Sequence, residues 1–369
     1  MQRATLMRSG KQVLRIGIPL VVLAAIIYFV GKDWNQEWHD LTAHRFQLNL
    51  WLLGLAFVGF LLQVLSYGMI WRAVLARLGY RLDLRACLRI YLASEFVRYI
   101  PGNVWHVLTR ILWVGKYGVS RPVAFASMTI ELITKLAAGV LVFALSLLFW
   151  ADISTLNTPL PARTLGIVLG LVCTLALLIG LHPRVLNGLL NFALRVLKRS
   201  PVALTMRYQD ILLVTLAWCV SWLIAGSAFF VLLCALLPGA QLTLLPVCIG
   251  IYAIVWDIGF VSFITPSGLG VREAAVVTLF SLAFPSSVIP VSIAAIIAIL
   301  SRFVSTVAEF LCVGIAYISG GRQVRALQQE QGAQPADAVM AETGSAADVD
   351  PPSEVSSLPV PLERGSGID

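Results

Sequence analysis

Charged side chains are scarce in this sequence. Asp, Glu, Lys and Arg make up 12% of its 369 residues, against about 25% in typical soluble domains. Hydrophobic residues make up 59%, and the mean hydropathy is +0.86. So few charges cannot cover the surface of a water-soluble fold of this length. The composition therefore excludes a soluble globular domain and predicts a polytopic membrane protein.

The sequence patterns of common catalytic and cofactor sites are also missing. The chain contains no GxxxxGK[ST] phosphate loop, no HExxH and no GxSxG, which would indicate nucleotide binding, zinc binding and a nucleophilic serine. Its six cysteines are dispersed and form no CxxC pair, so neither a zinc site nor a disulfide framework is indicated. We therefore expect no enzyme activity, no cofactor and no metal. Any transport would be driven by a gradient, by coupled chemistry elsewhere or by an imbalance of substrate.

Acidic residues are absent from the N-terminus and concentrated near the C-terminus. Residues 1–15 hold four basic residues, and residues 320–369 hold eight acids with three arginines, a net charge of −5 against +8 for the whole chain. Basic segments stay on the cytoplasmic side, so we expect a cytoplasmic-membrane protein with both termini inside and no nucleic-acid partner. The tail is rich in Ala, Pro, Ser and Gly and is expected to be disordered. Residues 16–319 form the expected transmembrane domain.

Long apolar runs divide this domain into helices, so the predicted fold class is all-α. A bilayer needs about 20 apolar residues per crossing helix. The run 274–284 would be an eighth crossing if both termini lie inside, and 185–197 fits an amphipathic helix at the membrane surface. We expect seven to eight transmembrane helices, with clear spans at 16–30, 50–70, 122–150, 165–181, 211–237, 244–264 and 291–318.

Two apolar regions are interrupted by proline and glycine. Proline cannot continue a helix and glycine lowers the cost of a bend, so we expect the helices to end there. The runs 87–100 and 104–114 are each too short to cross, and the first break fits a re-entrant hairpin. Two such breaks in corresponding halves favour an inverted repeat with a transport site, whereas ordinary loops at the membrane surface are the alternative. The break residues are Pro101, Gly102, Asn103, Pro266, Gly268 and Gly270.

Several charged residues lie inside or beside the predicted helices, where a charge costs about 2.5–3.5 kcal/mol on insertion scales. Glu131 and Lys135 are four residues apart on one helical face, in the orientation that favours an ion pair. Asp257 lies within the span 244–264. Such charges mark a pathway or a pair, and a self-neutralised pair that merely faces protein is the alternative. The candidate substrate-binding residues are Arg110, Glu131, Lys135, Arg272, Glu273 and Arg302.

The second break lies in a recognisable motif. Residues 265–275, TPSGLGVREAA, resemble the TPGGLGxRE signature of the flippase-like transmembrane domain of lysylphosphatidylglycerol synthases. The Pro101-Gly102 segment and the helix with Glu131 resemble the looser first signature, and the resemblance covers roughly residues 10–320. In two-domain members it implies a membrane half that moves aminoacylated phosphatidylglycerol between leaflets. A soluble synthase half is not expected here, so lysyl transfer is not expected either.

The residues and the resemblance together favour a lipid translocase or lipid-handling protein. The sequence departs from the family signatures at 103–106 and at Ser267. Its cargo is therefore left open between an anionic phospholipid and a polyprenyl-phosphate-linked glycolipid.

The predicted roles follow from side-chain chemistry. We expect Arg110, Arg272 and Arg302 to neutralise a phosphate, since the arginine fork suits phosphate oxygens. Glu131 and Glu273 would hold these arginines or meet a cationic or sugar headgroup. The alternative function is a non-transporting membrane partner of a glycosyltransferase or lipid synthase, which would tolerate alanine at the glycines of the second break. An intramembrane lipid-modifying enzyme has little support, because no nucleophile–base pair is visible.

Overall fold

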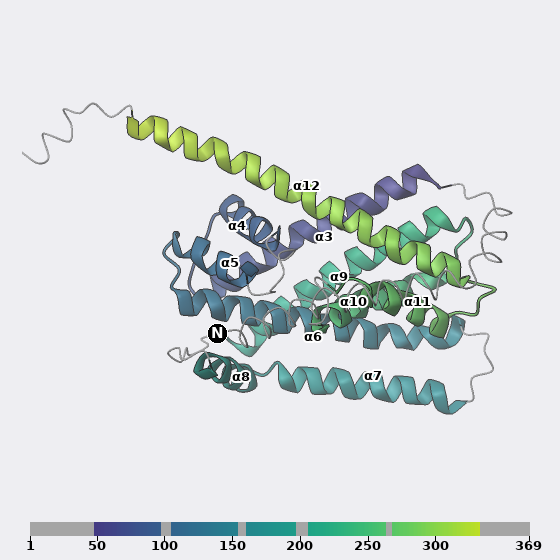
Figure 1. Ribbon diagram of the computed structural model, residues 1–369. Helices are drawn as coiled ribbons and strands as arrows, with labels where there is room; N and C mark the ends of the chain where they lie inside the picture. The colour runs from purple at the N-terminus through teal and green to yellow at the C-terminus, as the bar shows by residue number, and fades with distance from the viewer. Residues whose placement is uncertain (1–47, 97–104, 154–159, 197–205, 263–267, 333–369) are drawn as a thin grey trace, which may run out of the picture. The chain divides into compact units, whose positions relative to one another are not determined.

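Helices make up all the regular structure that is described. The computed structural model describes residues 48–96, 105–153, 160–196, 206–262 and 268–332, and each regular element in these ranges is a helix (Figure 1). The α-helices are α3 (Leu50–Arg77), α4 (Leu84–Phe96), α5 (Trp105–Gly115), α6 (Arg121–Ile153), α7 (Leu160–Gly180), α8 (Pro183–Val196), α9 (Tyr208–Leu236), α10 (Leu245–Val261), α11 (Val271–Ala283) and α12 (Val291–Gly332), and the 3-10 helix η2 (Leu242–Leu244) precedes α10.

Five of these helices are long and apolar enough to cross a membrane, by length and composition. They are α3, α6 (Arg121–Trp150), α9, η2 with α10 (Leu242–Val261) and the first part of α12 (Val291–Ala316). The prediction of an all-α polytopic membrane protein is confirmed. The expected span 16–30 lies outside the described residues, and α7 and α11 are not among the five.

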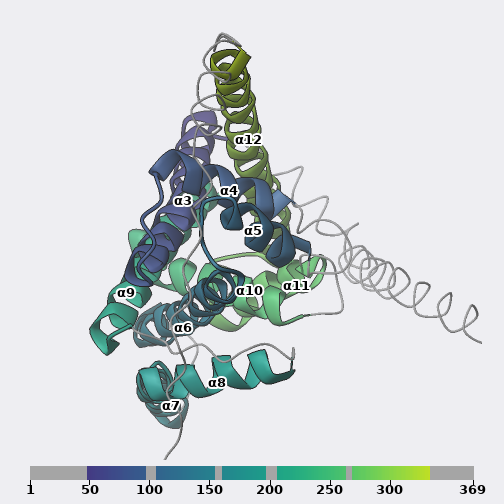
Figure 2. The ribbon, with the colours of Figure 1, turned by 90° about the vertical axis from the view of Figure 1, so that its left-hand side faces the viewer.

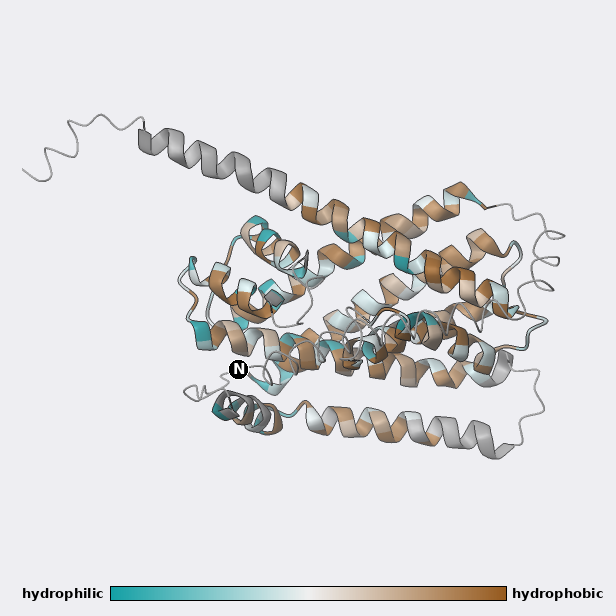
Figure 3. Ribbon diagram, in the orientation of Figure 1, coloured by the Kyte–Doolittle hydropathy of each residue, from teal (hydrophilic) through white to brown (hydrophobic). Residues whose placement is uncertain are grey.

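The outward faces of the long helices are apolar. Leu62, Leu216, Ile299 and Phe303 are each more than half exposed, and Figure 3 shows hydrophobic residues along the coloured parts of these helices. In water such a surface would be an aggregation liability. Against lipid it costs nothing, so it indicates which faces meet the hydrocarbon core.

Close helix contacts build the interior of the bundle. Helix α3 packs on α9, α10 packs on both α6 and α9, and α7 packs on α6 (Figures 1 and 2). A Cβ added at Gly226 of α9 would overlap Ile249 of α10, and one at Gly59 of α3 would overlap Ala228 of α9. Small residues at these positions let helix backbones approach closely, which is how membrane helices gain packing energy.

The helices beside the two breaks are short. With a rise of about 1.5 Å per residue, the 13 residues of α4, the 11 of α5 and the 13 of α11 fall short of a hydrocarbon core about 30 Å thick. Helix α4 packs on α5, and α11 packs on α10. Each break therefore joins a pair of helices whose short members cannot cross alone.

The contacts within the chain define two units, Met1–Ile318 and Ser319–Asp369. Helix α12 continues across this division to Gly332. The rest of the acidic tail and the basic residues 1–15 lie outside the described residues. The expectations made for these two segments therefore stay predictions.

Candidate functional site

A buried arginine joins the three helices around the first break. Arg110 of α5 donates from Nε to Ser94 Oγ at 2.9 Å, from Nη1 to Glu131 Oε2 at 2.8 Å and from Nη2 to Glu95 Oε1. The Tyr91 hydroxyl donates to the other Glu131 oxygen at 2.6 Å. Arg110 is 2% exposed and Glu131 is 6% exposed. We call these five residues the Arg110 cluster.

The Arg110 cluster is a closed set of charge-assisted hydrogen bonds. Although burial opposes its charge, Glu131 and Glu95 hold the pKa of the Arg110 guanidinium above its ordinary value. The guanidinium carbon also lies 3.9 Å from the centre of the Tyr91 ring and 5.3 Å from that of Trp71, which adds cation–π attraction. The cluster therefore ties α4, α5 and α6 together through a cation that stays charged.

A cavity of about 210 Å³ adjoins this cluster. It combines both signs of charge with aromatic walls, and it is formed mainly by side chains of α4, α5, α6 and α10. Its lining residues are Tyr91, Glu95, His106, Val107, Arg110, Phe125, Met128, Thr129, Glu131, Leu132, Lys135, Trp256 and Phe260.

Lys135 lies in a cage of aromatic rings at one side of this cavity. Its Nζ is 3.8 Å from the ring centres of Tyr67 and Trp256, 4.9 Å from that of Trp218 and 5.9 Å from that of Trp222. Lys135 is 4% exposed. The negative faces of the rings replace part of the hydration that the ammonium loses on burial. The aromatic cage is defined by these four rings.

Trp256 connects the cage to the second break. The guanidinium carbon of Arg272 in α11 is 5.3 Å from the Trp256 ring centre, so this ring contacts both Arg272 and Lys135. Arg272 also lies against Gly259 of α10, where an added Cβ would overlap its side chain. One indole therefore lies beside two cations that come from different parts of the sequence.

A second ion pair lies on α11 and α12. Arg302 Nη1 donates to Glu273 Oε1 at 3.0 Å, and the backbone N–H of Gly270 donates to Glu273 Oε2 at 2.6 Å. Glu273 thus closes the first turn of α11 while it fixes an arginine of the last long helix. Glu273 and Arg302 border a cavity of about 40 Å³, which Arg272 and Trp256 also line.

The glycines of the second break permit a turn that packs on α10. Gly268 has φ +70° and Gly270 has φ +82°. Residues with a side chain are strained in this left-handed region of the backbone, whereas glycine is not. A Cβ at Gly268 would lie 2.8 Å from both the Cα and the carbonyl oxygen of Gly259. The turn therefore needs glycine for both its conformation and its close approach.

We expect Gly268→Ala to lower the free energy of unfolding by at least about 1–2 kcal/mol, the cost of a left-handed residue. The contact with Gly259 adds to this cost because backbone cannot move aside cheaply. Thermal unfolding of the purified protein in detergent measures the change. Gly54→Ala, at a helical position with nothing within 4 Å, is the control and should unfold at the wild-type temperature or above. Equal stability of the two variants would contradict this account of the turn.

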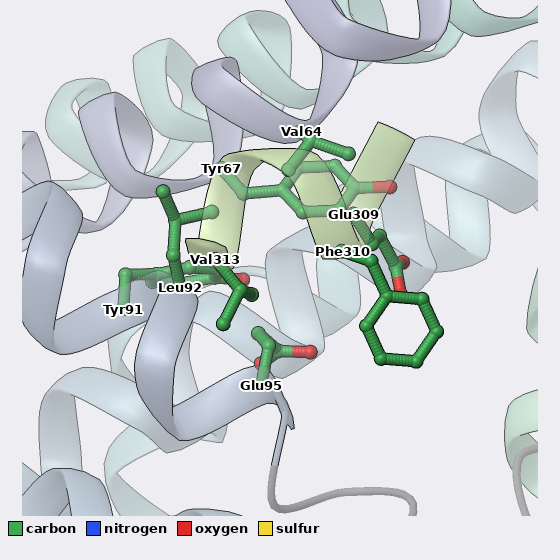
Figure 4. A pocket seen from close by; sticks show the side chains of 8 residues that line it. All are labelled: Val64, Tyr67, Tyr91, Leu92, Glu95, Glu309, Phe310 and Val313. Atoms are coloured by element: carbon green, nitrogen blue, oxygen red, sulfur yellow. The ribbon is translucent and has the colours of Figure 1, made fainter. Parts of the chain in front are cut away.

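A small pocket of about 10 Å³ lies where α3, α4 and α12 meet. Glu95 of the Arg110 cluster and Glu309 of α12 both line it, with Tyr67 of the aromatic cage beside them (Figure 4). The remaining lining residues are Val64, Tyr91, Leu92, Phe310 and Val313. Glu95 therefore borders both the Arg110 cluster and a pocket lined by α12.

The structure divides the residues predicted from the sequence between two places. Arg110, Glu131 and Lys135 line the larger cavity, and Arg272, Glu273 and Arg302 line the smaller one. Gly268 and Gly270 form the turn before α11. Pro101, Gly102, Asn103 and Pro266 lie outside the described residues.

Tertiary contacts add to the pairing that spacing suggests. Glu131 forms an ion pair with Arg110 of another helix, and the ammonium of Lys135 lies among aromatic rings. The aromatic half of the site was not predicted. The spacing of Trp218 and Trp222, four residues apart and thus on one helical face, was the signal that could have indicated it.

Comparison with known families agrees with the motif in the second break. The model of the family described as the lysylphosphatidylglycerol synthase TM region matches residues 16–312. No curated protein matches the chain. Because the family match covers most of the chain, including both cavities and the turn between α10 and α11, this protein belongs to the family of the lysylphosphatidylglycerol synthase transmembrane region.

Proposed function

We propose that this protein binds the headgroup of an anionic membrane lipid in its interior and moves that lipid between the two leaflets. The cargo is an anionic phospholipid or a polyprenyl-phosphate-linked glycolipid, and the site is in the cytoplasmic membrane. The proposed role is binding and movement, with no covalent chemistry. The observation that carries the proposal is the pair of cations, Lys135 and Arg272, that lie against one indole ring and line two neighbouring cavities.

Energetics support a functional reading of these charges. A charged side chain within a membrane-spanning helix is costly, and such residues usually mark a substrate pathway. Lys135 belongs to the spanning helix α6, and Arg272 begins α11 directly after the break. A phosphate that reached both cations would form charge-assisted hydrogen bonds, which are stronger than neutral ones.

The remaining charged residues hold the site in shape under this proposal. Arg110 donates to three acceptors of the protein, and Arg302 is held by Glu273. We assign these two arginines to positioning α4, α5, α6, α11 and α12. This differs from the expectation that all three arginines neutralise the headgroup.

The proposal is tested by reconstitution in liposomes with two cargoes in separate samples, fluorescent phosphatidylglycerol and a fluorescent polyprenyl-phosphate sugar. The fraction of label that reaches the opposite leaflet is followed over time. Arg272→Ala should reduce this movement to the rate of protein-free liposomes, because it removes a cation of the site. Arg184→Ala, at an exposed position of α8, should move lipid at the wild-type rate.

Each outcome decides between the two functions. Movement of one cargo that requires Arg272 would support a translocase and identify its class of lipid. If folded wild-type protein moves neither cargo, or if Arg272→Ala moves it normally, this site does not translocate lipid. The alternative is then a non-transporting partner of a glycosyltransferase or lipid synthase.

A further inference from the structure

One buried carboxylate lies within electrostatic reach of both cations of the proposed site. Asp257 of α10 is 5% exposed, and neither of its oxygens has a hydrogen-bond partner among the described residues. A buried ionised carboxylate is costly unless it is paired and hydrogen-bonded. In a membrane-spanning helix this cost makes such a residue a candidate for a proton relay or an ion pathway.

Packing places Asp257 between the helices that carry the two cations. A Cβ added at Gly139 of α6 would overlap the Asp257 carboxylate, and Lys135 is four residues earlier on the same face of α6. On the other side, the Arg272 side chain lies against Gly259, two residues beyond Asp257. Gly139 thus leaves room for a carboxylate where any larger residue would displace it.

The charged groups that act on Asp257 come from two of the helices packed around α10. They are Lys135 from α6 and Arg272 from α11. Helix α9, which also packs on α10, contributes Trp222, whose ring centre is 5.4 Å from that of Trp256. The electrostatic state of Asp257 is therefore tied to the same two cations that would bind a lipid phosphate.

We propose that Asp257 is a proton-binding residue of this site, ionised while it offsets one of the two positive charges of Lys135 and Arg272, and protonated when an anionic headgroup engages those cations. The inference rests on the proposed function, and it adds a proton as the second ligand. Formal charge balances: one phosphate charge enters, and one proton from solvent neutralises the carboxylate. The net charge of the buried group is the same in both states, so no additional charge is buried in the membrane.

Thermodynamic linkage gives the direction in which lipid affinity changes with pH. Because the lipid-bound state holds a proton that the free state lacks, affinity for an anionic lipid must rise as pH falls. The steepest dependence for one proton is about tenfold per pH unit. Bound lipid must in turn raise the proton affinity of Asp257. Lipid and proton would then cross the membrane together, so a proton gradient could drive the movement of lipid.

The test uses the full-length protein in detergent and short-chain phosphatidylglycerol as the probe. Isothermal titration calorimetry in two buffers with different ionisation heats gives the number of protons taken up per lipid bound. Wild type should take up close to one proton, and binding should weaken as pH rises. Asp257→Asn, which mimics the protonated side chain, should bind with no proton uptake and little dependence on pH. Asp210→Asn, at a partly exposed carboxylate of α9, is the matched control and should behave as wild type.

Each remaining result has a defined meaning. Binding without proton uptake in wild type, or equal uptake in Asp257→Asn, would overturn the assignment while leaving lipid binding intact. If phosphatidylglycerol does not bind at all, the proposed function fails for this lipid, and infrared titration of the same samples decides the proton site separately. A carboxyl band that titrates in wild type and is absent in Asp257→Asn supports the assignment, and no band specific to Asp257 rejects it.

Discussion

Replacing Glu131 with alanine is expected to lower the free energy of unfolding by about 3–5 kcal/mol, the cost of breaking a buried ion pair from one side. Glu131 accepts from both Arg110 and Tyr91, and each donor would lose its partner. A buried, uncompensated arginine is the larger part of this cost. The expected result is a protein that inserts in the membrane but unfolds at a much lower temperature in detergent.

The matched control for this prediction is the ion pair between Arg77 of α3 and Asp210 of α9. Its Nε and Oδ1 atoms are 3.0 Å apart, close to the 2.8 Å between Arg110 and Glu131, but its side chains are 30% and 31% exposed. Partly exposed pairs contribute about 0–1 kcal/mol, so Arg77→Ala should change thermal unfolding very little. If Glu131→Ala is as stable as Arg77→Ala, the Arg110 cluster does not hold the helices together.

Lys135→Met is expected to separate stability from function. Methionine has a similar length and no charge, so it suits the aromatic cage and removes a buried cation whose insertion is costly. The variant should unfold at or above the wild-type temperature. Its lipid movement in liposomes should nevertheless fall by roughly 10- to 100-fold, because the headgroup loses a charge-assisted hydrogen bond of about 1.5–3 kcal/mol.

Lys116→Met serves as the control, because Lys116 is exposed in the turn between α5 and α6. It makes the same change in composition without altering the cage. Thermal unfolding and lipid movement are measured on the same preparations of all three proteins. A Lys135→Met protein that moves lipid at the wild-type rate would show that the caged ammonium has a purely structural role.

The membrane class and the helices could be read from the sequence because both depend on local composition. The apolar runs expected at 50–70, 122–150 and 211–237 are contained almost entirely in α3, α6 and α9. The ends of the helices also depend on residues close to them in the sequence. Asn49 caps α3 through its side chain, and Gly268 and Gly270 adopt positive φ directly before α11 begins at Val271. Hydrophobic length and turn chemistry act over a few residues, so they need no knowledge of the fold.

The partners of the charged residues were decided only by the tertiary structure. Sequence spacing places Lys135 beside Glu131 within α6, but Arg110 arrives from α5 with a guanidinium that can donate to Glu131 and to Glu95 at once. Lys135 contacts Tyr67, Trp218 and Trp256, which lie on three other helices.

The sequence by itself determined that this chain is a helical membrane protein with charges at two breaks. Which charges meet was settled by packing, because the contacts join residues far apart in the chain. Trp256 shows the reason most clearly: its own helix gives no hint of a cation, yet its ring lies beside Lys135 of α6 and Arg272 of α11. Buried charges take whichever partners the assembled helices bring within a few ångströms, because an unpaired charge is costly in a low-dielectric interior.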